Sequence, residues 1–539
     1  MYECPGCGAN MKFDIASQQM ACVYCGMQVE PHSLQKDEDA TSDDTFEVTK
    51  FTCPQCGGEM LSGDQDATAF CSFCGAANIL TSRLVREKRP RYIIPFKKTK
   101  EDCKKAYAKK MRWALFAPRE LRDPSHIDSF RGIYMPYWTY QLEQKGGICL
   151  KGKKSYRKGD YVYTEHYDLL GEIDADYYGF SYDASSTFYD NISESLAPYY
   201  VRDQLEFTPA YLSGFYADIA DVDEYLYREN AMMMANESSW AQISSTKAFK
   251  KYNVSSTSQS NLTEKLHTQF TAAHSTMYPV WFLSWRKDDR VAYATVNGQT
   301  GKVAADLPID IKKFIALSLV LAVPLFILFN IIGTMKPSTL LILCSLLSIV
   351  AAWIYLLELR AIRRRENNET DVALQMKAAM KGQPGTPPPS GSLKLFRSER
   401  PQTPSVRLSL ASLITFMMFG SMFLPLWPVF VLEFGGRAKV IWPLIALIVC
   451  AVFYFMSLWT EKKLENYRHR YGGLAAMGAQ AVVASICYVN PVSDLWYYLG
   501  ALLIMLSVLY DILDILGSYN RLAMRRLPQF DKQGGDDRA

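Results

Sequence analysis

The chain has 539 residues, of which 49% are hydrophobic and 21% charged, and its formal net charge is +4. This length predicts several domains, and so small a net charge excludes an argument about partners from overall charge alone. Local charge is far from even, because residues 1–80 hold three Lys, no Arg and twelve Asp or Glu, whereas residues 83–112 hold thirteen Lys or Arg. We expect an acidic N-terminal part, a basic hinge, a soluble domain and, beyond residue 310, a membrane region.

One cysteine pattern occurs twice in the first eighty residues. Two C-x₂-C pairs separated by fourteen residues recur at an offset of 49, and glycine follows each pair. The eight cysteines are Cys4, Cys7, Cys22, Cys25, Cys53, Cys56, Cys71 and Cys74. Zn²⁺ binds four thiolates tetrahedrally, and glycine permits the positive φ that a C-x₂-C turn needs. The repeat predicts tandem Cys4 zinc ribbons over 1–34 and 50–82, with two structural Zn²⁺ ions and an acidic linker over 35–49.

Two other interpretations of the ribbons have to be weighed. Disulfides would suit a small secreted domain, but no cleavable signal peptide precedes Cys4, and the topology argued below places this end in the cytosol. Zinc ribbons are also associated with transcription and replication proteins. DNA affinity, however, comes largely from Lys and Arg at phosphates, and the charges of residues 1–80 sum to −9 before any metal is bound. This acidity argues against nucleic acid and favours protein contact or structural support.

Residues 83–310 predict a cytosolic α+β domain with a mostly antiparallel, aromatic-rich sheet. Thr99 and Asp102 form a capping-box pattern at the start of a helix. Its apolar face holds Cys103, Tyr107, Met111 and Ala114. The lysines on the remaining faces are Lys104, Lys105, Lys109 and Lys110. They indicate a solvated surface or, in a sharper interpretation, a patch against anionic lipid.

Further elements of this domain follow from residue alternation and turn signals. Strands are expected over Tyr92–Phe96, Gly132–Tyr140, Tyr161–Thr164, Tyr278–Trp285 and Arg290–Val296, and helices near Val222–Met234 and Leu262–Ala273. The last helix would place His267 and His274 on one face, in structural or solvated roles. Asn297–Lys302 contains Asn-Gly, which predicts a hairpin turn. The segment lacks the sequence pattern of a phosphate-binding loop, which argues against that alternative. The sequence holds no combination of residues typical of catalysis, so we expect a protein that is not an enzyme.

Several short motifs resemble those of a known family. They are the CPxCG ribbon and the segments Tyr92–Lys97, Gly132–Trp138, Tyr278–Trp281, Asn297–Val303, Arg526–Phe530 and Gly534–Asp537. Together they resemble bacterial TFIIB-type zinc ribbon-containing membrane proteins. The chain is also similar to the zinc-ribbon membrane component encoded with phage-shock (PspA-like) proteins. The resemblance, over roughly residues 50–310 and the tail, implies a membrane-bound recruiter or scaffold for envelope-stress proteins, without known chemistry.

Six apolar segments beyond residue 310 are long enough to cross a hydrocarbon core of about 30 Å. They are Phe314–Met335, Ser338–Leu359, Leu408–Phe434, Val440–Trp459, Gly472–Val489 and Leu495–Tyr519. We expect a transmembrane hairpin over 311–359, a basic Pro/Gly-rich cytosolic loop over 360–407, a four-helix group over 408–519 and a cytosolic tail over 520–539. The fifth segment is the shortest, and a re-entrant or interfacial helix is the alternative there.

Basic residues set the expected orientation of these segments. Lys and Arg cluster before the first segment and after the second, fourth and sixth, whereas the opposite loops hold only Lys336, Arg437 and Lys439. The positive-inside bias therefore predicts a multi-pass protein of the cell (cytoplasmic) membrane with both termini in the cytosol. Asp511 and Asp514, near the cytosolic end of the last segment, are expected to reach the membrane interface.

These features favour a non-enzymatic integral membrane protein that acts as a scaffold or recruiter. Its partners would be proteins at the cytoplasmic membrane surface, and by the resemblance its role would lie in envelope stress. Two alternatives are a membrane-tethered nucleic-acid-binding protein and a transporter that uses the six spans. A homo-oligomer is compatible with each of these functions.

Overall fold

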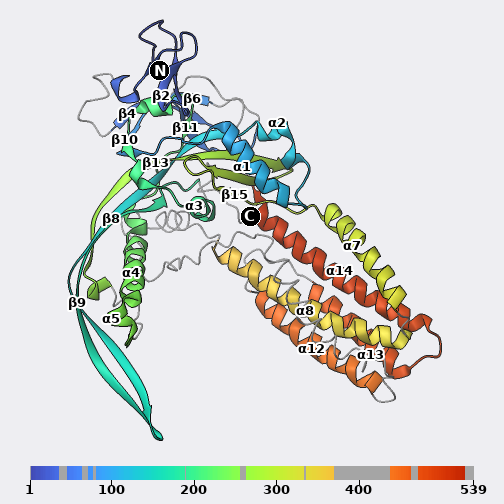
Figure 1. Cartoon of the computed structure of the whole chain (residues 1–539). Coiled ribbons are helices and arrows are strands. Elements are labelled where there is room, and N and C mark those ends of the chain that lie inside the picture. The colour runs from blue at the N-terminus through green and yellow to red at the C-terminus, as the bar shows by residue number, and fades with distance from the viewer. Residues whose placement is uncertain are drawn as a thin grey trace, which may run out of the picture.

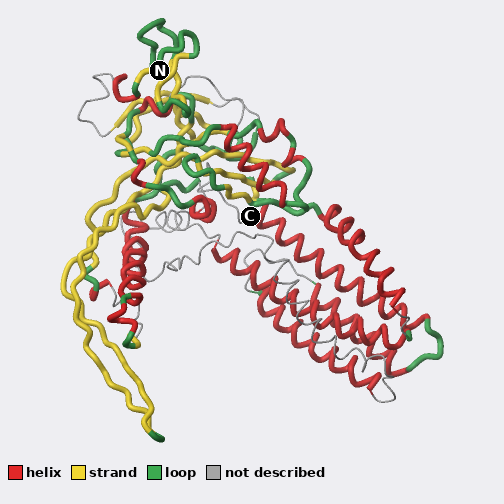
Figure 2. Tube along the Cα trace, in the orientation of Figure 1, coloured by secondary structure: helices red, strands yellow, loops and turns green. Residues whose placement is uncertain are grey.

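The computed structural model of the chain describes residues 2–34, 45–62, 71–76, 81–187, 190–254, 263–332, 336–368, 438–462 and 471–527. A sheet-rich soluble part carries long helices that extend away from it together (Figures 1 and 2). The N-terminal residues lie at the end of the soluble part that is remote from these helices (Figure 1).

The described strands form two sheets. The smaller is antiparallel, with the order β1 (Met11–Asp14), β2 (Gln19–Cys22), β3 (Gln28–Val29). The larger has 13 strands. They are β4 (Thr45–Thr52), β5 (Glu59–Ser62), β6 (Thr81–Lys88), β7 (Tyr92–Ile93), β8 (Arg131–Lys158), β9 (Tyr161–Asp183), β10 (Leu205–Glu206), β11 (Tyr216–Ala217), β12 (Asn253–Val254), β13 (Thr268–Lys287), β14 (Arg290–Asn297), β15 (Val303–Ala305) and β16 (Arg525–Arg526). Its main path is β10-β7-β13-β8-β11-β5-β4-β6, and only the described pairs β11–β8 and β13–β7 are parallel.

The strands of the second ribbon belong to this large sheet. β4 pairs with β5 and β6, and β5 pairs with β11 of the α+β domain. The first five residues of β4, 45–49, fall in the range expected as linker, and residues 35–44 lie outside the described part of the chain. The second ribbon is therefore part of the domain sheet, at one end of it, and not a separately folded domain.

The long hairpin β8–β9 forms a curved arm that leaves the body of the sheet (Figure 1). Its strands pair from Tyr137↔Asp183 to Lys158↔Tyr161. Helix α4 (Arg228–Ser245) covers part of the arm, and Tyr140 and Leu142 of β8 share a buried cluster with Ala231 of that helix. The helix expected at Val222–Met234 is thus present, but it begins later and runs further.

Helix α1 (Lys100–Trp113) has the predicted start and the predicted buried face. Thr99 and Asp102 form both hydrogen bonds of the capping box, and Cys103, Tyr107 and Met111 are buried. The other described helices of the soluble part are short: α2 (Pro124–Ile127), α3 (Asp190–Leu196) and α5 (Lys247–Lys250).

Aromatic rings fill the centre of the soluble part. Phe96 stacks on Phe215 with ring centroids 4.7 Å apart and lies 5.1 Å from the ring of Trp281. A Cβ atom at Gly132 would lie 2.5 Å from the Phe215 ring, and one at Gly298 equally close to Phe96. These two positions therefore require glycine because the backbone touches the aromatic core.

The helix expected over Leu262–Ala273 is wrong for most of its length, since among its described residues only 263–265 are helical. Strand β13 begins at Thr268, which pairs with Gln144 of β8. The buried amide of Gln144 also donates to the Thr268 hydroxyl at 2.8 Å, so pairing with β8 decides the conformation of this segment. His274 lies on β13, and His267 precedes it with φ of +52°, so the two histidines share no helical face.

The segment Asn297–Lys302 is the predicted turn between strands. Asn297 Oδ1 accepts hydrogen bonds from the backbone N–H of Gln299 at 2.8 Å and of Thr300 at 2.9 Å. Strand β15 follows directly, with Val303 paired to Val296 of β14. This arrangement is a side-chain-stabilised hairpin turn, and it lacks the helix that would follow a phosphate-binding loop.

Five long helices follow the soluble domain in the described residues: α7 (Ile311–Ile332), α8 (Pro337–Asn368), α12 (Ala438–Glu461), α13 (Gly472–Val489) and α14 (Leu495–Ala523). Four stretches in them are long and apolar enough to cross a membrane: Pro337–Arg365, Val440–Glu461, Gly472–Val489 and Leu495–Ala523. The chain is thus a candidate membrane protein. The described residues support four of the six predicted spans. Leu408–Phe434 lies outside the described residues, and Phe314–Met335 falls on α7, whose side chains are described only in part.

One bound and two carboxylates of the membrane half can be compared with the prediction. The cytosolic loop predicted to begin at residue 360 is still helical there, because α8 continues to Asn368. Asp511 is only 3% exposed and lies against the start of α13, where a Cβ atom at Gly472 would be 2.7 Å from its Oδ1. Asp514 accepts a hydrogen bond from the Tyr355 hydroxyl of α8 at 3.0 Å. Both carboxylates therefore turn toward neighbouring helices, and their position at the membrane interface stays a prediction.

Candidate metal centres

The four C-x₂-C-G segments fold into the same turn. In each, the glycine N–H donates to the carbonyl of the first cysteine at 2.8–3.0 Å, and the glycine has φ between +68° and +74°. The four glycines are Gly8, Gly26, Gly57 and Gly75. L-residues with a side chain rarely adopt this φ, so the glycine after each pair has the role that the sequence predicted.

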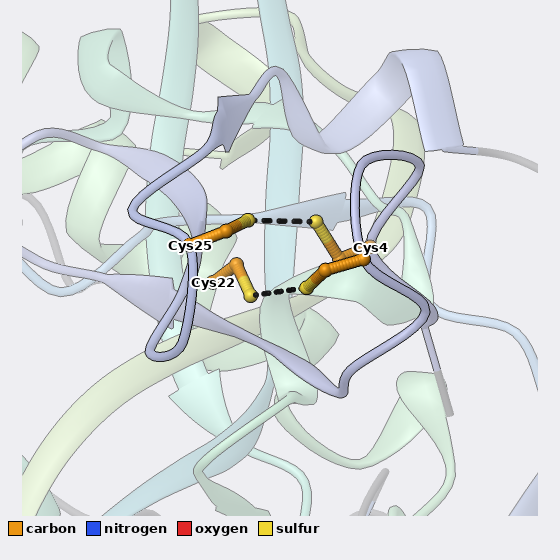
Figure 3. Close-up of side chains that lie close together, drawn as sticks. Cys4, Cys22 and Cys25 are labelled. Atoms are coloured by element: carbon orange, nitrogen blue, oxygen red, sulfur yellow. Dashed lines mark hydrogen bonds between the residues drawn. The ribbon is translucent and has the colours of Figure 1, made fainter.

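The eight predicted cysteines come together in two groups of four. In each group the sulfur atoms all lie within 4.8 Å of one another. In the first ribbon the Sγ atoms of Cys4 and Cys25 are 3.4 Å apart, and in the second ribbon those of Cys53 and Cys74 are 3.8 Å apart. Figure 3 shows Cys22 and Cys25 facing Cys4 across the first group.

These distances fit a tetrahedral tetrathiolate site. Four sulfurs at about 2.3 Å from a zinc ion would be about 3.8 Å from one another. A disulfide would bring two sulfurs to about 2.05 Å, and all eight cysteines are free thiols. Each group can therefore hold one metal ion, and the alternative of two disulfides per ribbon does not fit the geometry.

Backbone N–H groups of the turns favour the thiolate form that binds metal. The N–H of Cys25 points at Cys22 and lowers the pKa of that thiol to about 6. In the second ribbon the N–H of Gly58 donates to Cys56 Sγ at 3.4 Å. Because a metal ion binds the thiolate, the lowered pKa of Cys22 favours metal binding in the first group.

The two groups differ in exposure. In the first ribbon Cys4 and Cys22 are buried, whereas Cys7 and Cys25 are exposed. The hairpin β1–β2 packs on the domain through Phe13, whose ring lies 5.1 Å from that of Tyr211, and this leaves the outer sulfurs open. In the second ribbon all four cysteines are 0% exposed.

The second ribbon is enclosed by its contacts with the domain sheet. The Tyr293 hydroxyl of β14 donates to the carbonyl of Phe73 at 2.6 Å, and the Phe73 ring packs edge-on against Phe282 of β13. Arg286 donates to the Gln55 side chain at 3.1 Å. Leu527, just after β16, packs against the same cluster. The cysteine spacing gave no sign of this burial.

The corresponding surface of the first ribbon is open. Val23 and Tyr24, between Cys22 and Cys25, are 78% and 85% exposed. At the repeat offset of 49, Tyr24 corresponds to the buried Phe73. The sequence signal that could have singled out this pair is an apolar and an aromatic residue between two metal-ligating cysteines.

No family model and no solved structure matches the chain. It is similar to the "Uncharacterized protein YdjG" of Bacillus subtilis (strain 168), with 29% identity over 322 residues. The alignment covers 58% of this chain and 92% of that protein. The name of that protein assigns no activity.

Proposed function

We propose that this protein is a non-enzymatic membrane adaptor. In this proposal both Cys4 groups hold Zn²⁺, the second ribbon is structural, and the first ribbon binds a partner protein at the cytoplasmic membrane surface. Six spans, with both termini in the cytosol of the cell membrane, would anchor it. A role beside envelope-stress proteins is the extension that the family resemblance suggests.

The contrast between the two repeats carries the proposal. Phe73 of the second ribbon is 2% exposed and packs on an aromatic sheet surface formed by Phe282 and Tyr293. Tyr24 holds the same place in the first ribbon and is 85% exposed. Val23, Tyr24 and Met27 lie close together in the chain and are all exposed, and a group of exposed apolar side chains is typical of a protein-binding site. We infer that Tyr24 docks on a partner that offers an aromatic sheet surface of the same kind.

The arrangement of the whole chain supports an adaptor. The first ribbon lies at the end of the soluble part remote from the long helices, where a partner can approach it (Figure 1). Helix α7 (Ile311–Ile332) supports a further span beside the four candidates, because 22 residues of helix reach about 33 Å. Its exposed residues include Leu319, Val323 and Ile331.

Capture of partners by the purified full chain tests the first ribbon. Tyr24→Ser is expected to weaken capture by roughly 30-fold, since loss of an aromatic anchor costs about 2 kcal/mol or more. Cys7→Ser is expected to abolish the same capture by removing the metal. Leu84→Ser on β6 is the matched control, because Leu84 is also exposed, at 68%, but lies outside both metal-binding turns. Equal capture by all four proteins, compared by quantitative mass spectrometry, would contradict the proposal.

One observation favours transport as a second function. Asp511 is 3% exposed inside the helix group, and a buried carboxylate within a span is a functional hypothesis by default. In vesicles loaded with pyranine, an imposed pH gradient should then drive proton flux through the wild-type chain, and Asp511→Asn should reduce it to the level of empty vesicles. Flux that is absent from the wild type, or unchanged in the variant, rejects transport of protons.

A further inference from the structure

The segment that directly follows α1 is held against the start of α7. The backbone N–H of Asp310 donates to the carbonyl of Phe116 at 2.8 Å, and Lys313 Nζ donates to the carbonyl of Ala117 at 2.7 Å. The rings of Phe116 and Phe314 lie 5.2 Å apart. Residues 114–117 therefore have a fixed position beside the first turn of α7.

This contact lies at the level where candidate spans end. Ile309 and Asn520 exchange two hydrogen bonds, of 2.7 and 2.8 Å, and Asn520 is three residues before the end of α14. Arg365, the last residue of the candidate span in α8, forms an ion pair with Asp306 at 2.9 Å. The end of α1 is therefore close to the boundary between the helix group and the soluble part.

The side chains exposed there combine apolar bulk with positive charge. Trp113 is 74% exposed and Leu115 is 61% exposed. Lys105, Lys109 and Arg112 are also exposed, and with Trp113 they lie on the face of α1 opposite its buried residues. Residues 105–119 contain five Lys or Arg and no Asp or Glu.

We propose that this α1 surface, formed by Lys105, Lys109, Arg112, Trp113 and Leu115, binds anionic phospholipid in the headgroup layer next to the soluble part. Trp and Leu insert best where the headgroups meet the acyl chains, and Lys or Arg beside an anionic membrane adds about 1 kcal/mol each. The hydrogen bonds to Phe116 and Ala117 bring both apolar side chains to that depth. The soluble part is thus fixed relative to the bilayer at a second place besides the spans.

A photo-crosslinker at position 113 tests the proposed lipid contact. The full chain, with p-benzoyl-phenylalanine in place of Trp113, is reconstituted in phosphatidylcholine alone or mixed equally with phosphatidylglycerol. We expect lipid adducts at position 113, about fivefold more abundant for phosphatidylglycerol than for phosphatidylcholine. The same crosslinker in place of Tyr24 should give no lipid adduct, because Tyr24 is 85% exposed and belongs to the first ribbon, whose strand β2 lies at the end of the soluble part remote from the long helices (Figure 1). Equal adducts at both positions, or adducts to protein only at position 113, would overturn the proposal.

A second set of variants tests the contribution of charge. Lys105→Gln, Lys109→Gln and Arg112→Gln together are expected to remove the preference for phosphatidylglycerol while the fold is retained, because all three side chains are exposed. The matched control neutralises three exposed basic residues on β6, with Arg83→Gln, Arg86→Gln and Lys88→Gln. If the control loses the preference equally, or the α1 variant keeps it, the lipid contact is not electrostatic and the proposal fails.

Discussion

Replacing Cys56 with serine is expected to destabilise the soluble part strongly, whereas replacing Cys7 should destabilise it only slightly. Binding of a structural zinc ion contributes roughly 10–16 kcal/mol, as much as the whole stability of about 5–15 kcal/mol of a typical domain. Cys56 lies in the enclosed group, whose ribbon supplies β4, β5 and β6 to the domain sheet. Cys7 is exposed, and the hairpin of its ribbon keeps apolar contacts with the domain.

Thermal unfolding of both variants in detergent, followed by circular dichroism, measures this difference. Cys56→Ser should lower the melting temperature by about 10 °C or more, because a loss of about 4 kcal/mol already has that effect in a domain of this size. Cys7→Ser should lower it by only a few degrees. Metal analysis supplies the control, because each variant should have lost about one metal ion per chain. Equal destabilisation of the two variants would mean that the enclosure of the second ribbon has no energetic consequence.

The sequence predicted the local features of the metal centres well, because metal binding dictates them. Four thiolates, two tight turns and a glycine with positive φ leave few ways to build each ribbon, so Cys4 and Gly8 lie where the pattern requires them. The capping box at Thr99 is local in the same sense. Such features depend only on residues a few positions apart in the chain. They can therefore be predicted from a single sequence.

Long-range contacts were not predictable from the sequence in this way. Thr268 lies in a strand because Gln144, more than a hundred residues earlier, pairs with it. Phe73 is buried because Phe282 and Tyr293 lie beside it, and the equivalent Tyr24 has no such neighbours among the described residues. The two repeats have the same cysteine spacing, so only the tertiary structure separates a structural ribbon from an open one.

The C-terminal strand is a further example of a distant contact. β16 (Arg525–Arg526) follows the last candidate span and pairs with Arg290 and Val291 of β14. Two residues are too few to give a strand signal in a sequence. This pairing adds β16 to the sheet beside β14, and Leu527, the next residue, packs against the buried cluster of the second ribbon. The end of the membrane half therefore contributes to the site at the other end of the chain.

Metal release from the wild-type chain is expected to occur in two well-separated phases of about one ion each. A chelator or thiol reagent can reach Cys7 and Cys25 directly, whereas all four sulfurs of the second group are 0% exposed. Release from the second group therefore requires a local opening, and each 1.4 kcal/mol or so of opening free energy slows it about tenfold. The absorbance of a pyridylazoresorcinol–zinc complex follows both phases.

Alkylation assigns the phases to the ribbons. With N-ethylmaleimide present, mass spectrometry should find the four cysteines of the first ribbon modified during the fast phase and those of the second only during the slow phase. Cys7→Ser should remove the fast phase alone. Phe73→Ser removes the ring that packs against Phe282, so it should accelerate the slow phase. Tyr24→Ser, the same change at the equivalent open position, should leave both rates unchanged. A single phase in the wild type, or equal effects of the two serine variants, would show that exposure does not govern metal release. The difference in burial between the two ribbons would then have no kinetic counterpart.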